Sequence, residues 1–446
     1  MIFDHAPEAM NAVRDKAFED FKRLGFPSRK VERYKYTSMG ELFAPDYGLN
    51  LNRLQFPVNP YDVFRCDVPN LSTQLFFMVN DAFYQGAQGG LPQGEKEGVQ
   101  VCSLSTLNSQ LSTQNSPLPS SLLPITYGKL ARTEDDAVTA LNTMLAQDGL
   151  LVYVPKNVKV DKAIQVINML TLPQAAPDTS LMVNRRVLIV VEEGAEVKLL
   201  FCDHAADDHH FLTTQVIEAY VGENASLDLY CLEETHIKNV RVSNVYVEQQ
   251  ANSHVTHNVI TLHNGTTRNR LDLHFRGEGA ECWLGGCVIA DKQQHVDNNT
   301  LITHKVPHCT SNELYKYVLD DKAVGAFAGR VLVEHGAQKT TSQMTNQNLT
   351  ATKEARMYTQ PMLEIYADDV KCAHGSTVGQ LNDAALFYMR QRGISLQEAK
   401  MLLQNAFINE VIDHMQLEPL RDRLHYLVEK RFRGELNKCE GCKLCK

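Results

Sequence analysis

The residues best suited to chemistry lie between Leu363 and Gly379, where a thiol and an imidazole follow an acidic pair. Asp368, Asp369, Cys372 and His374 fall within seven residues. If this stretch is extended, side chains two residues apart point to the same face, so the thiol and the imidazole can meet one ligand. Cysteine and histidine together suit borderline-soft metals such as iron and zinc, but a closed site needs about four ligands. The pair is therefore half of a metal or sulfur site, unless both are ordinary strand residues, which spacing alone favours.

Strands must position this stretch, because short β-branched and aromatic runs bounded by Gly, Asn and Asp fill the sequence from about residue 75. A small residue recurs at the start of new strands, at intervals of 30, 26, 29, 29 and 28 residues: Ala195, Ala225, Ala251, Ala280, Cys309 and Ala337. A β-sandwich also spaces its strands regularly. The near-constant interval nevertheless favours a solenoid of stacked coils.

Helical periodicity flanks the strands. One amphipathic helix is predicted near the N-terminus, ending at Gly25, and another over residues 134–147. After Gly379 we predict three helices: one capped at Asn382 or Asp383, one opened by a capping box at Ser395 and Glu398 with an apolar stripe that includes Leu396 and Leu402, and one around Leu420 to Val428. The expected organisation is an N-terminal helical region (1–75), a strand region with the solenoid (76–375), a C-terminal helical domain (376–435) and a flexible cysteine-rich tail (436–446).

Composition and net charge limit the classes of binding partner that the chain can have. The chain has 446 residues, 43% of them hydrophobic, and a net charge of −9, which argues against nucleic acid and anionic membranes as binding partners. No apolar run is long enough to span a membrane, and the N-terminus lacks the basic and apolar regions of a secretion signal. We expect a cytoplasmic protein with mostly reduced cysteines.

Other groups of potential ligand residues give weaker evidence for a binding site. Cys439, Cys442 and Cys445 have metal-ligand or cluster-ligand spacing, but a fourth ligand is missing and a flexible thiol-bearing tail is favoured. The polar run over residues 203–210 could bind a divalent ion, although a solvated loop is the better interpretation. No GxxxxGK[ST] phosphate loop occurs, so we expect that the chain does not hydrolyse ATP itself.

Four segments resemble the SufB/SufD family, the scaffold subunits of the SUF iron–sulfur cluster assembly machinery. They are VERYKYT (31–37), ALNTMLAQDGLLVYVP (140–155), KTTSQMTNQNL (339–349) and IYADDVKCAHG (365–375). The chain departs from the family at Tyr34, where a Trp is usual. The KCAHG junction is similar to the SufD branch rather than to SufB, although SufB remains an alternative.

The resemblance implies a mainly β fold, a right-handed parallel β-helix flanked by N-terminal and C-terminal helices. It implies a non-catalytic scaffold that pairs with SufB and binds the SufC ATPase, with clusters forming near the SufB–SufD interface. His374 matches the SufD histidine implicated as an iron ligand there, opposite a cysteine from SufB, with Cys372 beside it in a less certain role. The C-terminal helices would dock SufC, with Phe387, Tyr388 and Met389 as candidate contacts.

The same resemblance implies no permanently bound cofactor. Iron or a nascent cluster would be held transiently, and whether a reduced flavin binds the assembled complex stays open. An isolated chain is expected to form a homodimer through the surface that otherwise meets SufB. Two alternatives come from other classes: a β-helical polysaccharide-active enzyme, which would need paired carboxylates in a cleft, and a stand-alone metal or redox protein, which would carry stoichiometric metal by itself.

Overall fold

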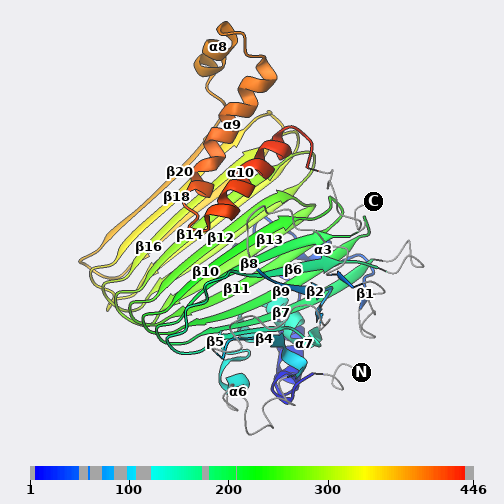
Figure 1. The fold of residues 1–446 in the computed structure, drawn as a ribbon, viewed down its shortest axis with the longest axis vertical. Helices are drawn as coiled ribbons and strands as arrows, with labels where there is room; N and C mark the ends of the chain where they lie inside the picture. Colours follow the sequence, from blue (N-terminus) through cyan, green and yellow to red (C-terminus); the bar gives the residue numbers. More distant parts are fainter. Residues whose placement is uncertain are drawn as a thin grey trace.

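The computed structural model describes residues 6–49, 59–60, 73–84, 98–106, 122–172, 180–206 and 208–436. This part of the chain is a parallel β-solenoid with helices toward both ends, which confirms the expected fold class (Figure 1). Its strands form two sheets. Sheet A contains β1 (Gly48–Leu49), β4 (Gln100–Ser103), β5 (Leu150–Val154), β7 (Leu181–Val191), β9 (Phe211–Val221), β11 (Val240–Gln249), β13 (Thr266–Phe275), β15 (His295–His304), β17 (Val324–Val333) and β19 (Arg356–Ile365).

Sheet B contains β2 (Gln74–Val79), β3 (Ala82–Phe83), β6 (Ile164–Leu170), β8 (Glu196–Ala205), β10 (Ser226–Glu234), β12 (His254–His263), β14 (Glu281–Ala290), β16 (Thr310–Leu319), β18 (Thr341–Thr350) and β20 (Lys371–Gly379). From β5 onward the chain alternates between the sheets, so each coil adds one strand to each of them. Strands β19 and β20 are the last members of the two sheets.

The turns between coils explain the repeat in the sequence. Ala195, Ala225 and Ala280 are completely buried just before β8, β10 and β14. Only a small side chain fits where one coil rests on the next. Gly279, with φ of 72°, supplies the left-handed conformation that one of these turns requires. The third coil differs from the prediction, since Ala251 is partly exposed and Ser253 is the completely buried residue before β12.

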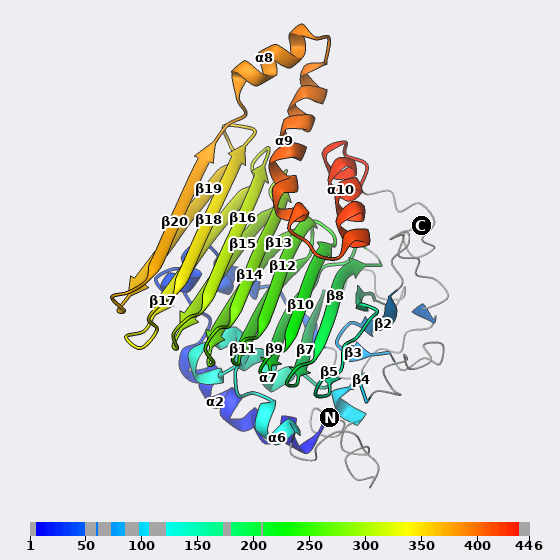
Figure 2. The ribbon, with the colours of Figure 1, turned by 60° about the vertical axis from the view of Figure 1, so that its left-hand side comes forward.

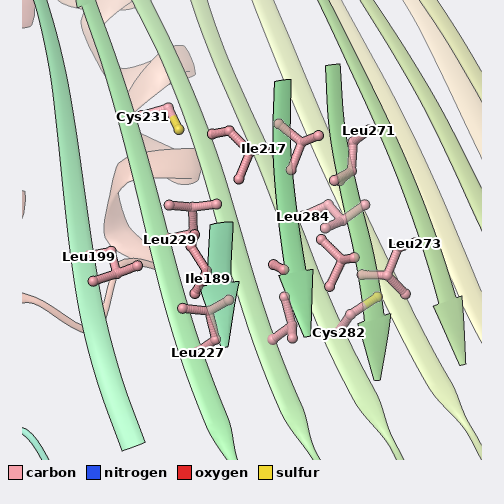
Figure 3. Packing of buried hydrophobic residues seen from close by; sticks show 14 of the residues in the cluster. Ile189, Leu199, Ile217, Leu227, Leu229, Cys231, Leu271, Leu273, Cys282 and Leu284 are labelled. Carbon is pink, nitrogen blue, oxygen red and sulfur yellow. The ribbon is translucent and has the colours of Figure 1, made fainter. Parts of the chain in front are cut away.

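The core lies between the two sheets. Alternate residues of each strand point inward, and side chains at matching register positions stack from coil to coil. In sheet A, Ile217, Val245 and Leu271 form one such column. Leu199 and Leu229 face them from sheet B, and Figure 3 shows both leucines with Ile217 and Leu271 packed between the strands.

Two C-terminal helices cover the outer face of sheet B. These are α9 (Leu396–Asp413) and α10 (Glu418–Phe432), while α8 (Asp383–Gln391) projects beyond the solenoid (Figure 2). The buried face of α9 contains Ile408, Val411 and Ile412, which pack with outward side chains of sheet B. The helices therefore lie on the flank of the solenoid and do not close its end.

The N-terminal elements lie against the outer face of sheet A. They are α1 (Glu8–Asn11), α2 (Arg14–Leu24), η1 (Glu32–Tyr34) and α3 (Met39–Leu42), joined by α6 (Leu122–Thr126), η4 (Thr133–Asp135) and α7 (Ala137–Leu145); η3 (Leu104–Thr106) follows β4. Residues 31–37, which we call the strap, cross this face. Tyr34 is buried, Thr37 donates a 2.6 Å hydrogen bond to Asp297, and Tyr36 stacks on Tyr358.

Three expectations need correction. The single N-terminal helix is two helices, α1 and α2, the second ending at Gly25 as predicted. The apolar stripe of α9 is only partly buried, because Leu396 and Leu402 are exposed. The polar run is not wholly a solvated loop, since Asp203 belongs to β8 and is buried against Arg185 and Arg241.

Candidate functional site

The site begins with three interior columns of sheet B that end on β20, the last strand. One column contains Leu199, Leu229, His257, Leu284, Glu313, Met344 and His374. The neighbouring columns end with Cys372, which follows Ser342, and with Ser376, which follows Asn346. Paired residues of parallel strands share a face, so all three side chains point to the interior side of the solenoid. The structure therefore places Cys372 and His374 on one face, as the spacing predicted.

Cys372, His374 and Ser376 are more exposed than the residues that precede them in the same columns. Met344 has no exposed surface, whereas its register partner His374 is exposed. In the described part of the chain nothing follows β20 in sheet B, so its interior face is covered from one side only. Cys372 is half-buried and packs against the core.

Cys372 and His374 differ in how readily each can bind a metal. Burial raises the pKa of the Cys372 thiol above its ordinary value. The thiolate is the form of cysteine that binds metal, so this burial opposes metal binding by Cys372 in the isolated chain. The His374 side chain is exposed, and an imidazole nitrogen is a ligand that borderline metals commonly accept. The exposed histidine is therefore the more available ligand of the pair.

A hydroxyl pair that the sequence reasoning missed lies beside them. The side-chain oxygens of Thr359 on β19 and Ser376 on β20 lie 2.7 Å apart and are hydrogen bonded. This bond joins the last strands of the two sheets across the interior. The signal that could have found Ser376 is its position two residues after His374, on the same face of the strand.

The acidic pair does not join this group. Asp368 and Asp369 lie in the exposed turn between β19 and β20, and Asp369 pairs with Lys339 of the preceding coil. An exposed ion pair of this kind contributes little to stability. The carboxylates thus offer no paired acid and base facing the column ends, as a polysaccharide-active site would require.

Large apolar side chains surround the open end of the solenoid. Tyr358 and Ile365 of β19, Tyr366 of the following turn and Val378 of β20 are each between 39% and 53% exposed. Strands β19 and β20 also present unpaired edges in the described structure. An uncapped coil with apolar surroundings and free strand edges is typical of a surface that another chain covers.

The predicted docking residues lie on α8. Asn382 caps this helix by accepting hydrogen bonds from the backbone N–H groups of Ala384 and Ala385. Phe387 and Tyr388 are 64% and 56% exposed, and Met389 is partly buried. Two neighbouring aromatic side chains exposed on a projecting helix provide an apolar contact surface.

The remaining metal candidates do not form a site in the described residues. No group of three or more His, Cys, Asp and Glu side chains is arranged to hold a metal there. The cysteines of the tail, Cys439, Cys442 and Cys445, lie outside the described residues. Among the helices of the described ranges, none has both the length and the apolar character needed to cross a bilayer.

Comparison with known proteins covers most of the chain. Residues 174–407 match the family model described as SUF system FeS cluster assembly, SufBD core domain, and residues 1–166 match the SufBD protein N-terminal region. The chain is 31% identical over 312 residues to the iron-sulfur cluster assembly SufBD family protein slr0076 of Synechocystis, covering 67% of this chain and 66% of that protein.

Two further relatives carry the name iron-sulfur cluster assembly protein SufD. The protein from Escherichia coli is 29% identical over 255 residues, which cover 54% of this chain and 57% of the relative. The protein from Bacillus subtilis is 25% identical over 302 residues, which cover 67% of this chain and 68% of the relative. The alignments to these three relatives thus span between 57% and 68% of their own lengths.

Proposed function

Because this chain belongs to the SufB/SufD family of SUF-system iron–sulfur cluster assembly proteins, we propose that it acts as a SufD-type scaffold subunit. In this proposal it pairs with SufB through the open end of its solenoid and binds the SufC ATPase through its C-terminal helices. One observation carries the proposal: an interior column of the solenoid ends in an exposed histidine, His374, on the last strand of sheet B.

The iron or nascent cluster is the cargo of the scaffold. His374 supplies one nitrogen ligand, which is too few to hold iron alone, since metal sites of this kind use about four ligands. The missing ligands come from the partner that covers the open end. Cys372 becomes a ligand only if docking or the metal itself promotes loss of its proton.

The C-terminal helices connect SufC to the same sheet. The amine of Lys316 on β16 donates a 3.1 Å hydrogen bond to the backbone oxygen of Phe407 and forms an ion pair with Glu410, both on α9. Arg431 of α10 pairs with Asp291 at 2.8 Å. A displacement of α8 by SufC is thereby transmitted through α9 to β16, and β18 alone lies between β16 and β20 in sheet B.

The chain itself performs no bond-making step in this proposal. Its described residues supply binding surfaces and one exposed ligand, and the energy comes from ATP hydrolysis by SufC. The isolated chain forms a homodimer through the same open end, because the apolar residues there are otherwise left in water. The complex works in the cytoplasm without a permanently bound cofactor.

Anaerobic co-expression with SufB and SufC, followed by size-exclusion chromatography and iron and sulfide analysis, tests the proposal. We expect one complex whose iron and cluster content depends on ATP. A chain that elutes alone with stoichiometric metal would instead establish the stand-alone metal protein. Removing residues 437–446 in parallel shows whether any such metal belongs to the tail.

A further inference from the structure

A cavity of about 450 Å³ lies on the opposite flank of the solenoid from α9 and α10. One wall is the outer face of β11, β13 and β15 in sheet A. The others come from Arg33 in η1 and from residues 129–135, the connection that precedes α7. Its volume falls in the range of roughly 300–1,000 Å³ that is common for small-molecule sites.

The lining of this cavity is strongly basic in a chain whose net charge is −9. Two carboxylates line it, Asp135 and Asp272, against six permanent cations: Arg33, Lys129, Arg132, Arg270, Arg276 and Lys305. Four more carboxylates pair with these cations from outside the lining: Glu134 with Arg132, Asp136 with Arg270, Glu248 with Arg276 and Glu334 with Lys305. These ion pairs therefore turn their positive ends toward the cavity.

Side chains at the floor of the cavity are held in place by hydrogen bonds, whereas the amines at its rim can reach a ligand. Arg270 is 3% exposed and holds Asp272 through two hydrogen bonds, of 3.1 and 2.5 Å, so its position is fixed. At the rim, Lys129 is exposed and forms no ion pair within the described residues, and the pair of Lys305 with Glu334 is long, at 3.8 Å. Such exposed and long pairs are weak, so these amines are free to contact a ligand.

An unused polar atom lies in the same wall. The Nδ1 atom of His274 on β13 is buried and has no hydrogen-bond partner in the described structure. A buried polar group without a partner is unfavourable, and a ligand that turns the imidazole toward the cavity is one way of satisfying it. From the cavity, its cations and this nitrogen we propose that the pocket binds a small molecule bearing phosphate.

Phosphate is the anion that this set of side chains suits best. Arginine offers several N–H donors in a fixed plane and lysine offers a mobile point charge, and both recognise phosphate oxygens. The cavity is larger than a single phosphate ion needs, so the ligand carries more than one phosphate or an organic group. The site lies on sheet A, away from His374, and does not depend on the proposed scaffold function.

Isothermal titration calorimetry of the purified full chain at low ionic strength tests the inference with two probes, inorganic pyrophosphate and ADP. Binding of pyrophosphate alone assigns an inorganic ligand, and tighter binding of ADP assigns a nucleoside-borne phosphate. Affinity should fall as salt is added, since the rim charges are screened. The absence of binding by both probes would overturn the inference.

Substitutions in the lining test whether the phosphate ligand binds in this cavity. Lys129→Gln combined with Lys305→Gln should weaken it at least about tenfold, because a hydrogen bond to a charged group is lost at each position. His274→Phe keeps a ring of similar size and should also weaken binding. The matched control is Lys162→Gln with Lys322→Gln, which removes the same charge from exposed turns outside the cavity. An equal loss in the control would mean nonspecific attraction and would also overturn the inference.

Discussion

His374 is the register partner of Met344, yet the methionine has no exposed surface and the histidine is exposed. The two side chains occupy equivalent positions in successive coils. Only the presence of a following coil distinguishes them. The histidine therefore occupies a core position at the point where the core ends, which gives it a fixed backbone and open access to a partner.

The variant His374→Ala should fold normally and lose function. An exposed substitution changes the free energy of unfolding by no more than about 0.5 kcal/mol. Because the proposed iron ligand is removed, iron retained by the proposed complex with SufB and SufC should fall to a small fraction of the wild-type value. Iron and sulfide analysis of the chromatographic peak measures this.

The control for that variant is His254→Ala, on β12, whose side chain is also well exposed at 59%. It should leave iron content unchanged. Normal cluster assembly by His374→Ala would remove this histidine from the site, and equal losses in both variants would indicate a general effect of removing histidine.

Alanine should destabilise the protein when it replaces an interior glycine but not when it replaces an exposed one. A Cβ on Gly286 would lie 2.0 Å from the buried ring of Tyr315, while a Cβ on Gly375 of β20 meets nothing within 4 Å. Gly286→Ala should therefore cost about 1–3 kcal/mol of unfolding free energy. Gly375→Ala should stay within about 0.5 kcal/mol. Urea unfolding of both variants measures the difference, and similar midpoints would contradict the packing described here.

The buried carboxylate of Glu218 should be essential for attaching residues 128–131 to sheet A. It accepts hydrogen bonds from the backbone N–H groups of Gly128, Leu130 and Ala131, and it pairs with the buried Arg186 at 2.5 Å. Glu218→Gln leaves the guanidinium without its counter-charge, which should cost about 3–5 kcal/mol. Urea unfolding gives the cost, and hydrogen exchange should show faster opening of residues 122–147.

The matched control is Glu193→Gln. This glutamate pairs with Lys156 at 2.6 Å, but both side chains are about half exposed, at 47% and 54%. Its loss should cost about 0–1 kcal/mol. Equal destabilisation by the two substitutions would show that burial of the Arg186 pair is unimportant.

Stability should depend on pH through Glu313. Burial raises the pKa of this carboxyl from 4.5 to about 7 in the folded chain. Between these values the folded state keeps a proton that the unfolded state has lost, so the contribution to stability is complete below pH 4.5 and is lost as pH rises toward 7. Glu313→Gln mimics the protonated form and should be more stable than wild type at pH 8 but not at pH 4.5.

Chemical unfolding of both proteins at the two pH values measures this effect. Glu281→Gln is the control, since Glu281 is 58% exposed. Comparison of variants at each pH cancels the contribution of buried histidines such as His304, whose pKa is lowered to about 3 by burial. A stability difference that does not change with pH would contradict the raised pKa of Glu313.

Much of the solenoid could be predicted from the sequence because its signals are local. Strand alternation and the small residues before each strand reflect the fit of one coil on the next, and the two-residue spacing of Cys372 and His374 places them on one face. Their position at the end of interior columns could not be predicted. That position depends on the register between coils, which is set by turns of unequal length between the strands.

The remaining errors also have physical causes. Leu396 and Leu402 look like core residues of α9, but the buried contacts of that helix come mainly from its second half, Ile408 to Ile412, where it meets sheet B. Asp203 looks like a surface residue because isolated charges avoid the core. It is buried because Arg185 on β7 and Arg241 on β11 neutralise it from the opposite sheet, a pairing that local sequence does not reveal.

The contacts of the strap, residues 31–37, affect the order in which parts of the protein fold. Its side chains bond to Asp272, Asp297 and Gln360, and the last of these contacts joins Tyr36 to a residue 324 positions later. The strap leaves the ribosome before β19 and must therefore wait until β19 has been synthesised. Contacts so distant in sequence form late. The strap settles only after β19 has formed, and the part of the outer face of sheet A that it crosses stays uncovered on the nascent chain until then.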